Sequence, residues 1–393
     1  MFFEFDDLAS LKAKIKVLGV GGAGGNAINR MIEDKLIGVE FIAVNTDAQD
    51  LENNLAEIKL QIGKTLTKGL GAGADIDVGR QAMEEDHVVI EKALTGADMV
   101  FITAGMGGGT GTGAAPSIAR IAKNLGILTV GIVTRPFIFE GRLRANRAEV
   151  GIAEMRKYCD TTLVIPNETL MRITDPGTSF ADALKLADSI LHQATRGISD
   201  LINIHGLMNL DFADIRTVML NMGDAIMGTG IGQGEERAIL AAQQAISSPL
   251  LQDCHIQGAR GLLVNVTGDP TMTLHEVNDA ASIINEEAGP DANVIFGAVI
   301  DKDLTDEFRV TVIATGFNRE DNHNLMEAAS RRRLQEEGAD LGGGRKVDDP
   351  SRLGQPTTLG SFDITHGDSA ADDKVAYGED LEVPAVLRSR YSS

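Results

Sequence analysis

The sequence predicts an α/β protein in which a doubly wound parallel sheet is followed by a long central helix and a second, smaller α+β domain with a mixed sheet. Up to residue 167, continuous apolar runs alternate with glycine-led or amphipathic segments of helix length. This pattern is typical of parallel strands that are covered on both faces. One apolar stripe of helical spacing then covers residues 178–204. Beyond it, strand-like runs alternate apolar and polar residues more clearly, which favours a mixed sheet.

Five apolar runs are expected to form the parallel strands of the first domain, which we assign to residues 1–177. Ligands of doubly wound sheets bind at the carboxyl ends of the strands, so the residues after these runs are the first candidates for a functional site. The runs are IKVLGV, GVEFIAVNT, MVFITA, ILTVGIV and TTLVIPN, at residues 15–20, 38–46, 99–104, 127–133 and 161–167.

The apolar stripe over residues 178–204 predicts one helix that connects the two domains. A helix of about 25 residues is about 38 Å long. The second domain, residues 205–317, is expected to contain helical and strand-like segments. The stripe consists of Phe180, Leu184, Ala187, Leu191, Ala194, Ile198 and Leu201, the helical segments lie at 211–221, 234–246 and 273–287, and the strand-like runs lie at 261–268, 292–300 and 308–316.

The apolar content falls after Phe317, which indicates a disordered C-terminal tail. Residues 318–376 are rich in Gly, Asp, Arg and Ser, as in a disordered linker. A linker of that length has an end-to-end distance on the order of 40 to 45 Å. Apolar residues return in residues 377–393, where EDLEVPAVLRSRY spans 379–391. A short apolar and charged peptide on a tether is typical of a docking motif, and an inert terminus is the alternative.

Composition and charge exclude several classes of protein. The 393 residues are 43% hydrophobic and carry a net charge of −21, which argues against a nucleic-acid partner or an anionic membrane surface. The cysteines, Cys159 and Cys254, form no CxxC motif, so a structural zinc site is disfavoured and a reducing cytoplasm is expected. No apolar run approaches the roughly 18 residues of a membrane span, and no signal peptide is recognisable. We therefore expect a cytoplasmic protein without direct membrane insertion.

The stretch GMGGGTGTGAAP, residues 105–116, is the first candidate for a binding loop. Glycine loses the most backbone freedom on folding, so such a cluster is unfavourable unless the site needs close backbone approach. A glycine loop between a strand and a helix can bind phosphate through the free N–H groups and the dipole of the helix N-terminus. Thr110 and Thr112 add hydroxyl donors. A flexible turn is the alternative.

Two further glycine loops accompany the first. GVGGAGGN, residues 19–26, fits G-x-G-x-x-G and is followed by Asp47, as in dinucleotide-binding folds. This favours an NAD-dependent oxidoreductase as an alternative, but nothing downstream supplies an acid or base for hydride transfer. The third loop is KGLGAGAD, residues 68–75. Three such loops at successive strand ends could enclose a triphosphate from several sides.

The ordered set of motifs resembles a known family. GGGTGTG, residues 107–113, resembles the signature loop of the tubulin/FtsZ superfamily, and GVGGAGGNA, NTDAQ, GLGAGA, TRPFIFEGRLR and NLDFAD resemble bacterial FtsZ in the same order. The resemblance implies a self-assembling cytoskeletal GTPase with GTP or GDP and Mg²⁺ as cofactors. It further implies head-to-tail polymerisation into protofilaments and a place in the cell-division ring at mid-cell.

The resemblance also implies which residues bind the nucleotide. Asp188 and Asn167 would read the guanine, because a carboxylate accepts from N1–H and the 2-amino group, which adenine lacks. Leu184 stands where many family members have a phenylalanine that stacks on the base, so apolar packing remains but ring stacking is lost. The other contacts fall on Gly21, Gly22, Asn26, Gly71, Ala72, Gly73, Gly107, Gly108, Gly109, Thr110, Gly111, Thr134, Glu140 and Arg144.

NLDFAD, residues 209–214, resembles the catalytic loop of the family. Spacing alone favours Asp211 or Asn209 as the cap of the following helix. The resemblance instead implies that Asn209, Asp211 and Asp214 position the attacking water at the γ-phosphate of a neighbouring subunit, so that hydrolysis depends on polymerisation. The Mg²⁺ ligands are not identified. A nucleotide-binding regulator without turnover is a further alternative, but it would be expected to have lost the two aspartates.

The terminal peptide resembles the segment that binds membrane-tethering division proteins of the FtsA or ZipA type in this family. Its matching residues are Leu381, Val383, Pro384, Val386 and Leu387. The final SRYSS departs from the commonest ending and leaves the preferred tether open. Division inhibitors are further candidate partners.

Overall fold

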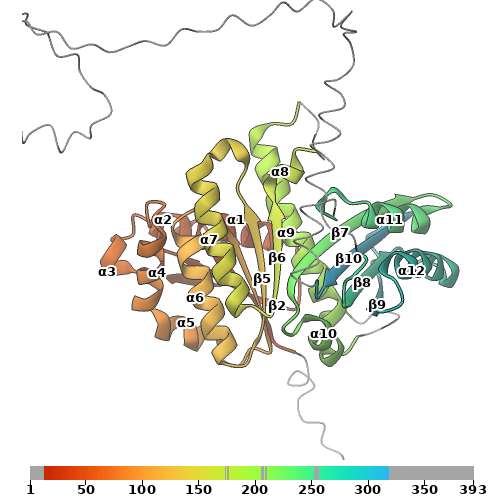
Figure 1. Ribbon diagram of the computed structural model, residues 1–393, viewed down its shortest axis with the longest axis horizontal. Helices are drawn as coiled ribbons and strands as arrows, with labels where there is room; N and C mark the ends of the chain where they lie inside the picture. The colour runs from red at the N-terminus through yellow and green to blue at the C-terminus, as the bar shows by residue number, and fades with distance from the viewer. Residues whose placement is uncertain are drawn as a thin grey trace, which may run out of the picture. The chain divides into compact units, whose positions relative to one another are not determined.

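The computed structural model describes residues 13–317 apart from 173, 175–176, 205–207, 209 and 252–255 (Figure 1). The predictions for the linker at 318–376 and the terminal peptide at 377–393 therefore lie outside the described residues, as does the predicted catalytic residue Asn209.

The first domain contains a six-stranded parallel sheet, as the apolar runs predict. Its strands lie in the order β3-β2-β1-β4-β5-β6, and every neighbouring pair is parallel. All carboxyl ends therefore meet at one edge. The strands are β1 (Ile15–Val20), β2 (Val39–Asn45), β3 (Ile58–Gln61), β4 (Met99–Gly105), β5 (Leu128–Arg135) and β6 (Thr161–Pro166).

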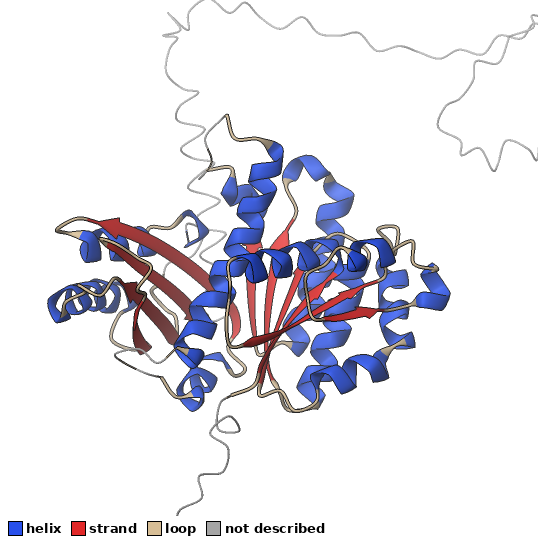
Figure 2. Cartoon of the chain, turned by 180° about the vertical axis from the view of Figure 1, so that it is seen from behind, coloured by secondary structure: helices blue, strands red, loops and turns tan. Residues whose placement is uncertain are grey.

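Helices cover both faces of this sheet (Figure 2). Helices α4 to α7 pack over one apolar cluster, which contains Leu18, and α1 and the long helix α9 pack over another, which contains Val17. Successive side chains of a strand point to opposite faces, so a sheet that is buried on both faces has nearly continuous apolar strands. The helices are α1 (Gly21–Glu33), α2 (Ala48–Glu52), α3 (Lys64–Thr67), α4 (Ile76–Glu85), α5 (His87–Leu94), α6 (Thr110–Asn124), the 3₁₀ turn η2 (Ile138–Glu140), α7 (Arg142–Tyr158), α8 (Asn167–Leu170) and α9 (Phe180–Asn203).

Helix α9 follows the prediction closely. Its first turn is capped by Ser179, whose hydroxyl accepts from the Asp182 amide at 3.2 Å. The predicted stripe is buried at Ala187, Leu191 and Ile198. At 24 residues, the helix is about 36 Å long. Within the described part of the chain, no helix is both long enough and apolar enough to cross a bilayer.

The smaller domain has a mixed sheet, as predicted, but this sheet continues the first one. Strands β7-β10-β8-β9 extend the order beyond β6 into a single ten-stranded sheet. The junction is narrow, because β6 pairs with β7 over only three residue pairs, Thr161–Leu163 against Gly223–Ala225. The elements are α10 (Phe212–Met219), β7 (Gly223–Gln233), α11 (Arg237–Ile246), η3 (Pro249–Leu251), β8 (Gly261–Gly268), α12 (Leu274–Ala288), β9 (Asn293–Ile300) and β10 (Glu307–Thr315).

Strand β7 is a long strand that the apolar pattern does not predict. Its sequence, GDAIMGTGIGQ, places Gly228, Gly230 and Gly232 on the face that meets α11. A Cβ at any of these three positions would overlap a backbone carbonyl oxygen of α11. The glycines therefore let a helix lie directly on the strand, and for the same reason they remove the apolar signal.

Candidate functional site

The glycine loops gather at the carboxyl edge of the parallel sheet. Helix α1 begins at Gly21, directly after β1, and α6 begins at Thr110, with four residues between it and the end of β4. Gly21 has a φ of 72°, which lies in the left-handed region where a side chain is strained. The third loop, residues 68–75, precedes α4 at the same edge.

Direct backbone packing holds the three loops together. A Cβ on Gly21 would lie 3.0 Å from the Gly111 amide nitrogen, and one on Gly109 would lie 2.8 Å from the Ala72 Cβ and 2.9 Å from the Asp75 nitrogen. Any side chain at Gly21 or Gly109 would push the loops apart. The cost of so many glycines is thus offset by the close approach of three loops around one space.

The amide groups at the start of α1 and α6 lack side-chain acceptors. The N-cap residues Val20 and Gly109 make no capping hydrogen bond. By contrast, Asp47 and Asp75 cap the neighbouring helices α2 and α4. The first amides of a helix need an acceptor, and the positive end of its dipole favours an anion. The edge is therefore chemically suited to phosphate.

Thr110 is held in place by a hydrogen bond to Thr46, the residue that follows β2. Its Oγ1 lies 2.6 Å from the Oγ1 of Thr46, and both residues are buried. The Thr46 amide donates to the Asn45 Oδ1 at 2.8 Å, which anchors the end of β2. Sequence reasoning missed the contact that Thr46 makes, although its position directly after an apolar run was a usable signal.

The predicted ribose and phosphate residues Thr134, Glu140 and Arg144 adjoin the 107–111 loop. Glu140 accepts from the Phe137 amide at 2.9 Å and pairs with the Arg144 guanidinium at 3.0 Å. A Cβ on Gly107 would lie 2.7 Å from the Arg144 Cγ, and the Thr134 carbonyl accepts from the Met106 amide at 2.9 Å. The end of β5, η2 and the start of α7 therefore form one wall of the same space.

The predicted guanine readers, Asn167 and Asp188, both have polar groups that burial disfavours. Asn167 begins α8 directly after β6, is 7% exposed, and has a buried Oδ1 without a hydrogen-bond partner. Burial raises the pKa of Asp188, on α9, to about 6, although Arg30 of α1 opposes the shift. A buried polar group without a partner is costly, as is a charge that is partly removed from water, so both residues fit a ligand that supplies donors. Leu184, one turn earlier on α9, is exposed.

Two carboxylates of the 45–50 segment border the glycine loops and could hold a cation. The Asp50 Oδ2 lies 3.6 Å from the place of a Cβ on Gly22, and the Asp47 Oδ2 lies 3.7 Å from that on Gly71. Burial and the charge of Asp47 raise the pKa of Asp50. Carboxylates beside phosphates suit Mg²⁺, which uses one or two carboxylates together with phosphate oxygens. The described residues contain no group of three metal-ligating side chains.

The predicted catalytic carboxylates lie elsewhere. Asp211 occupies the N-cap position of α10, but its side chain makes no capping hydrogen bond, so the capping role that spacing favours is wrong for Asp211. Asp211 and Asp214 are both exposed.

Helix α10 packs at the amino edge of the parallel sheet. The Thr161 hydroxyl, at the first residue of β6, donates to the Met219 carbonyl at 2.5 Å, and the Thr315 hydroxyl donates to the Val218 carbonyl at 2.7 Å. The glycine loops lie at the other edge, one strand length away. An eight-residue strand such as β5 is about 26 Å long. One subunit therefore does not bring its own carboxylates to its own glycine loops.

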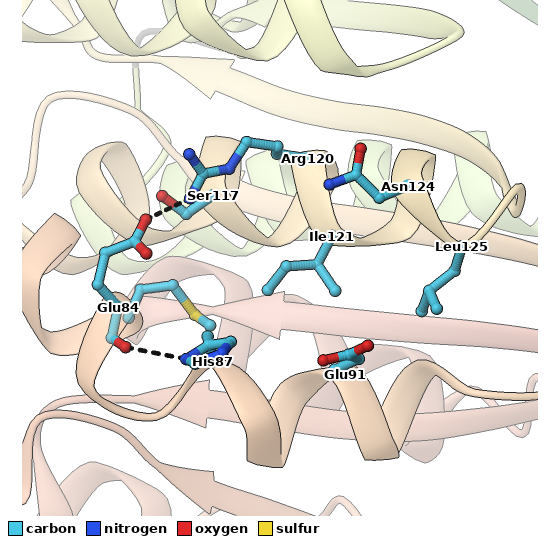
Figure 3. Close-up of a pocket in the computed structure, with 9 residues that line it drawn as sticks. Glu84, His87, Glu91, Ser117, Arg120, Ile121, Asn124 and Leu125 are labelled. Carbon is cyan, nitrogen blue, oxygen red and sulfur yellow. Dashed lines mark hydrogen bonds and ion pairs between the residues drawn. The ribbon is translucent and has the colours of Figure 1, made fainter.

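A separate cavity of about 350 Å³ lies between α4–α5 and α6, away from the loops (Figure 3). Glu84 pairs with Arg120 across it, and the His87 Nδ1 lies 3.2 Å from the Glu84 carbonyl oxygen. These polar groups satisfy one another, so we assign no chemistry to this cavity.

Comparison with known proteins identifies two matching family domains. The model described as Tubulin/FtsZ family, GTPase domain, matches residues 14–175, and the FtsZ family, C-terminal domain, matches residues 223–318. Among solved structures, an empty FtsZ dimer from M. jannaschii is 44% identical with a TM-score of 0.76, and the match covers 79% of this chain and 90% of that chain.

More distant structures share the fold. CetZ1 from Haloferax volcanii, a GDP-bound monomer, is 21% identical with a TM-score of 0.68 and covers 81% of this chain and 99% of that chain. CetZ2 from the same organism, a GTPγS-bound protofilament, is 22% identical with a TM-score of 0.66 and covers 82% and 99%.

Proposed function

The chain belongs to the FtsZ family of cytoskeletal GTPases, and on this premise we propose that it hydrolyses GTP at the contact between two subunits of a head-to-tail polymer. The observation that supports this proposal is the separation of the two halves of the site. The glycine loops lie at one edge of the parallel sheet. Helix α10, with Asp211 at its N-cap and Asp214 in its first turn, packs at the other edge. A second copy is needed to supply the carboxylates.

Exposed apolar side chains on both surfaces of the proposed subunit contact support it. On the nucleotide edge, Ile138 is 76% and Leu143 is 67% exposed, and Phe139 lies between them. On the surface that adjoins the start of α10, Met208, whose amide donates to the Ala298 carbonyl of β9 at 3.5 Å, is exposed, and Leu274, in the turn after the neighbouring strand β8, is 82% exposed. Apolar patches on a surface of this kind typically mark protein–protein contacts.

In the proposed mechanism, positioning and electrostatics carry most of the catalysis. The amides of α1, α6 and the 71–73 loop would hold the phosphates, while Asn167 and Asp188 would select guanine. Asp211, Asp214 and Asn209 of the next subunit would orient the attacking water, because weakly basic carboxylates act here mainly by orientation. Mg²⁺, held through Asp47 and Asp50, would balance the charge on the phosphates.

We further propose that the polymer is the division ring of a bacterial cell at mid-cell. This finer proposal rests on the motifs that resemble bacterial FtsZ, and the similar solved structures include an archaeal FtsZ. The segment 379–391 would dock to tethering proteins of the FtsA or ZipA type.

The first experiment measures GTP hydrolysis per subunit as the protein concentration rises, with light scattering followed in the same samples. A shared concentration threshold is expected, because only assembled subunits have a complete site. Constant turnover per subunit from the lowest concentration, without scattering, would contradict the proposal.

A mixture of two variants tests the shared site more directly. Asp211→Ala keeps an intact nucleotide edge, and Phe139→Glu keeps an intact carboxylate loop. Each alone should be nearly inactive, whereas the mixture should recover turnover at the one contact that combines both intact surfaces. No recovery, with both variants folded and binding GTP as expected, would count against a site built from two subunits.

A further inference from the structure

Arg237, at the start of α11, is a buried arginine that joins three separate segments. Its side chain is only 6% exposed. Its Nε donates to the Glu276 Oε1 at 2.6 Å, and its Nη2 donates to the Thr271 Oγ1 at 3.1 Å. Its Nη1 lies 3.2 Å from the Asp269 Oδ1 and 3.5 Å from the Asp306 Oδ1. One guanidinium thus links the β8–α12 turn, the first turn of α12 and the turn before β10.

The partners of Arg237 also hold one another. Asp269 accepts from the Thr271 hydroxyl at 2.7 Å and from the Asp306 amide at 2.9 Å. These bonds, with Arg237, hold the pKa of Asp269 at about 2. Glu276 accepts from the Thr273 amide at 2.7 Å, as part of the capping box of α12. The turn 269–276 is therefore fixed by side-chain hydrogen bonds at Asp269, Thr271, Thr273 and Glu276.

The residue that this fixed turn displays is apolar. Leu274 is the first residue of α12 and is 82% exposed, while Thr271 before it and Glu276 after it contact Arg237. A rigid turn lowers the entropy that must be lost when a side chain docks on a partner. Because its polar residues hold the 269–276 turn in place, the turn is suited to presenting the exposed Leu274 side chain to another surface.

We propose that Arg237 is a positioning residue of the contact between subunits: it fixes the 269–276 turn so that Leu274 docks on the exposed apolar residues Ile138, Phe139 and Leu143 of a second copy. This inference rests on the proposed function. The contacts of Arg237 all lie within the smaller domain, so it acts through the placement of Leu274. Leu274 follows β8, which pairs with β9, and the Ala298 carbonyl of β9 accepts from the amide of Met208, three residues before Asp211, so Leu274 adjoins the surface that the proposed contact already uses.

The main test compares critical concentrations for assembly. Arg237→Leu should raise the critical concentration about tenfold, which corresponds to about 1.4 kcal/mol of contact energy, while the GTP affinity of the monomer stays unchanged. Arg309→Leu is the matched control, because Arg309 pairs with Glu307 on β10 and does not touch the turn. Its critical concentration should equal that of the wild type.

A second variant protects the test against misfolding, because loss of Arg237 leaves buried carboxylates unpaired. Thr271→Val removes one Arg237 contact and one Asp269 contact and keeps the side-chain shape. It should raise the critical concentration less than Arg237→Leu, by about threefold, at an unchanged GTP affinity. A critical concentration that neither variant raises would overturn the inference.

A double-mutant cycle links Arg237 to Leu274. If Arg237 acts only by placing Leu274, the double variant Arg237→Leu/Leu274→Ala should assemble no worse than the weaker single variant. Independent effects, in which the two increases multiply, would show that Arg237 acts elsewhere and would overturn the proposal.

Complementation separates this inference from the proposed function. Mixing Arg237→Leu with Phe139→Glu should recover GTP turnover, because each retains the surface that the other lacks, whereas Arg237→Leu with Asp211→Ala should not. If the Asp211→Ala and Phe139→Glu pair recovers but the Arg237→Leu and Phe139→Glu pair does not, only the role of Arg237 fails. If neither pair recovers, the shared site itself fails.

Discussion

At the scale of single residues, the proposed nucleotide site contains polar groups that are energetically unfavourable in the empty subunit. Asn167 keeps a buried Oδ1 without a partner. Burial disfavours the charged form of Asp188 and raises its pKa to about 6. Val20 and Gly109 leave the first amides of two helices without a side-chain acceptor. Each of these costs the empty protein free energy, and under the proposed function a guanine nucleotide with its phosphates would relieve each of them.

Binding of GDP by the monomer should weaken below pH 6. Recognition of N1–H and the 2-amino group needs the ionised carboxylate of Asp188, and burial raises its pKa to about 6. Affinity should therefore fall by up to about tenfold per pH unit below that value. Fluorescent-nucleotide titrations between pH 5 and pH 7.5 measure this. Asp188→Asn should bind weakly with a flat profile, and a wild-type profile that is equally flat would exclude Asp188 as the titrating group.

The same raised pKa affects the stability of the empty protein. Because the folded state holds the Asp188 proton more tightly than the unfolded state, folding binds a proton between pH 4 and pH 6. The contribution of Asp188 to the free energy of unfolding therefore decreases as the pH rises through this window. Comparing thermal unfolding of the wild type and Asp188→Asn from pH 4 to pH 7 should show a gap that changes across this range and is constant above it.

Gly109→Ala should destabilise the empty protein by about 1–3 kcal/mol, because the new methyl group would overpack the contact with Ala72 and Asp75. Gly108→Ala is the matched control, since nothing lies within 4 Å of a Cβ there. Its free energy of unfolding should stay within about 0.5 kcal/mol of the wild type. Denaturant titrations of both variants measure the difference, and equal values would mean that the loops are not packed as described.

At the scale of elements, the ten-stranded sheet consists of two parts that are joined by one short strand pairing, between β6 and β7. Each neighbouring pair from β1 to β6 is parallel, yet β6 meets β7 over only three residue pairs. Beyond the junction, the stability of the second domain depends on α11 lying directly on β7. This contact exists because Gly228, Gly230 and Gly232 carry no side chains.

Gly230→Ala should therefore be among the most destabilising single-methyl additions in the smaller domain. The added Cβ meets the Ala241 carbonyl and the Ala245 nitrogen of α11, so the helix must shift, at a cost of about 1–3 kcal/mol. Thr229→Ala, on the opposite face of the same strand, is the control and should cost less than about 1 kcal/mol. Calorimetry of both variants tests whether the glycines serve the helix–strand contact.

Much of the fold could be predicted because its signals are local. The runs for β1 and β8 match the observed strands residue for residue, and the stripe of α9 is off by two residues at one end and one at the other. Strand β7 could not be predicted, because its close contact with α11 selects glycine instead of apolar residues.

The candidate site was only partly predictable, because some of its contacts join segments far apart in the sequence. The carboxyl-edge position of the three glycine loops follows from the strand pattern. The Thr46–Thr110 contact and the position of Asp50 beside Gly22 depend on how β2 lies against β1. The sequence also did not predict that the Asp211 carboxylate would make no capping hydrogen bond, because aspartate at an N-cap position usually forms one.

At the scale of the whole molecule, the two halves of the proposed site lie at opposite edges of the sheet, so GTP turnover should respond when variant and wild-type subunits are mixed. Asp211→Ala should bind GTP like the wild type and lose most of its turnover. Added to the wild type, it should change turnover non-additively with its mole fraction, because each inactive subunit affects the site of a neighbour. Turnover that falls in simple proportion to the wild-type fraction would indicate self-contained monomers.

The placement of glycine loops and carboxylates at opposite edges also has a consequence in time. In a stack of such subunits, every nucleotide except the one at a single terminus is covered by the next copy. Exchange of spent for fresh nucleotide is then confined to that terminus. The age of the bound nucleotide would increase steadily with distance from the end at which subunits are added. The nucleotide at each position would therefore reflect the order in which the subunits joined the filament.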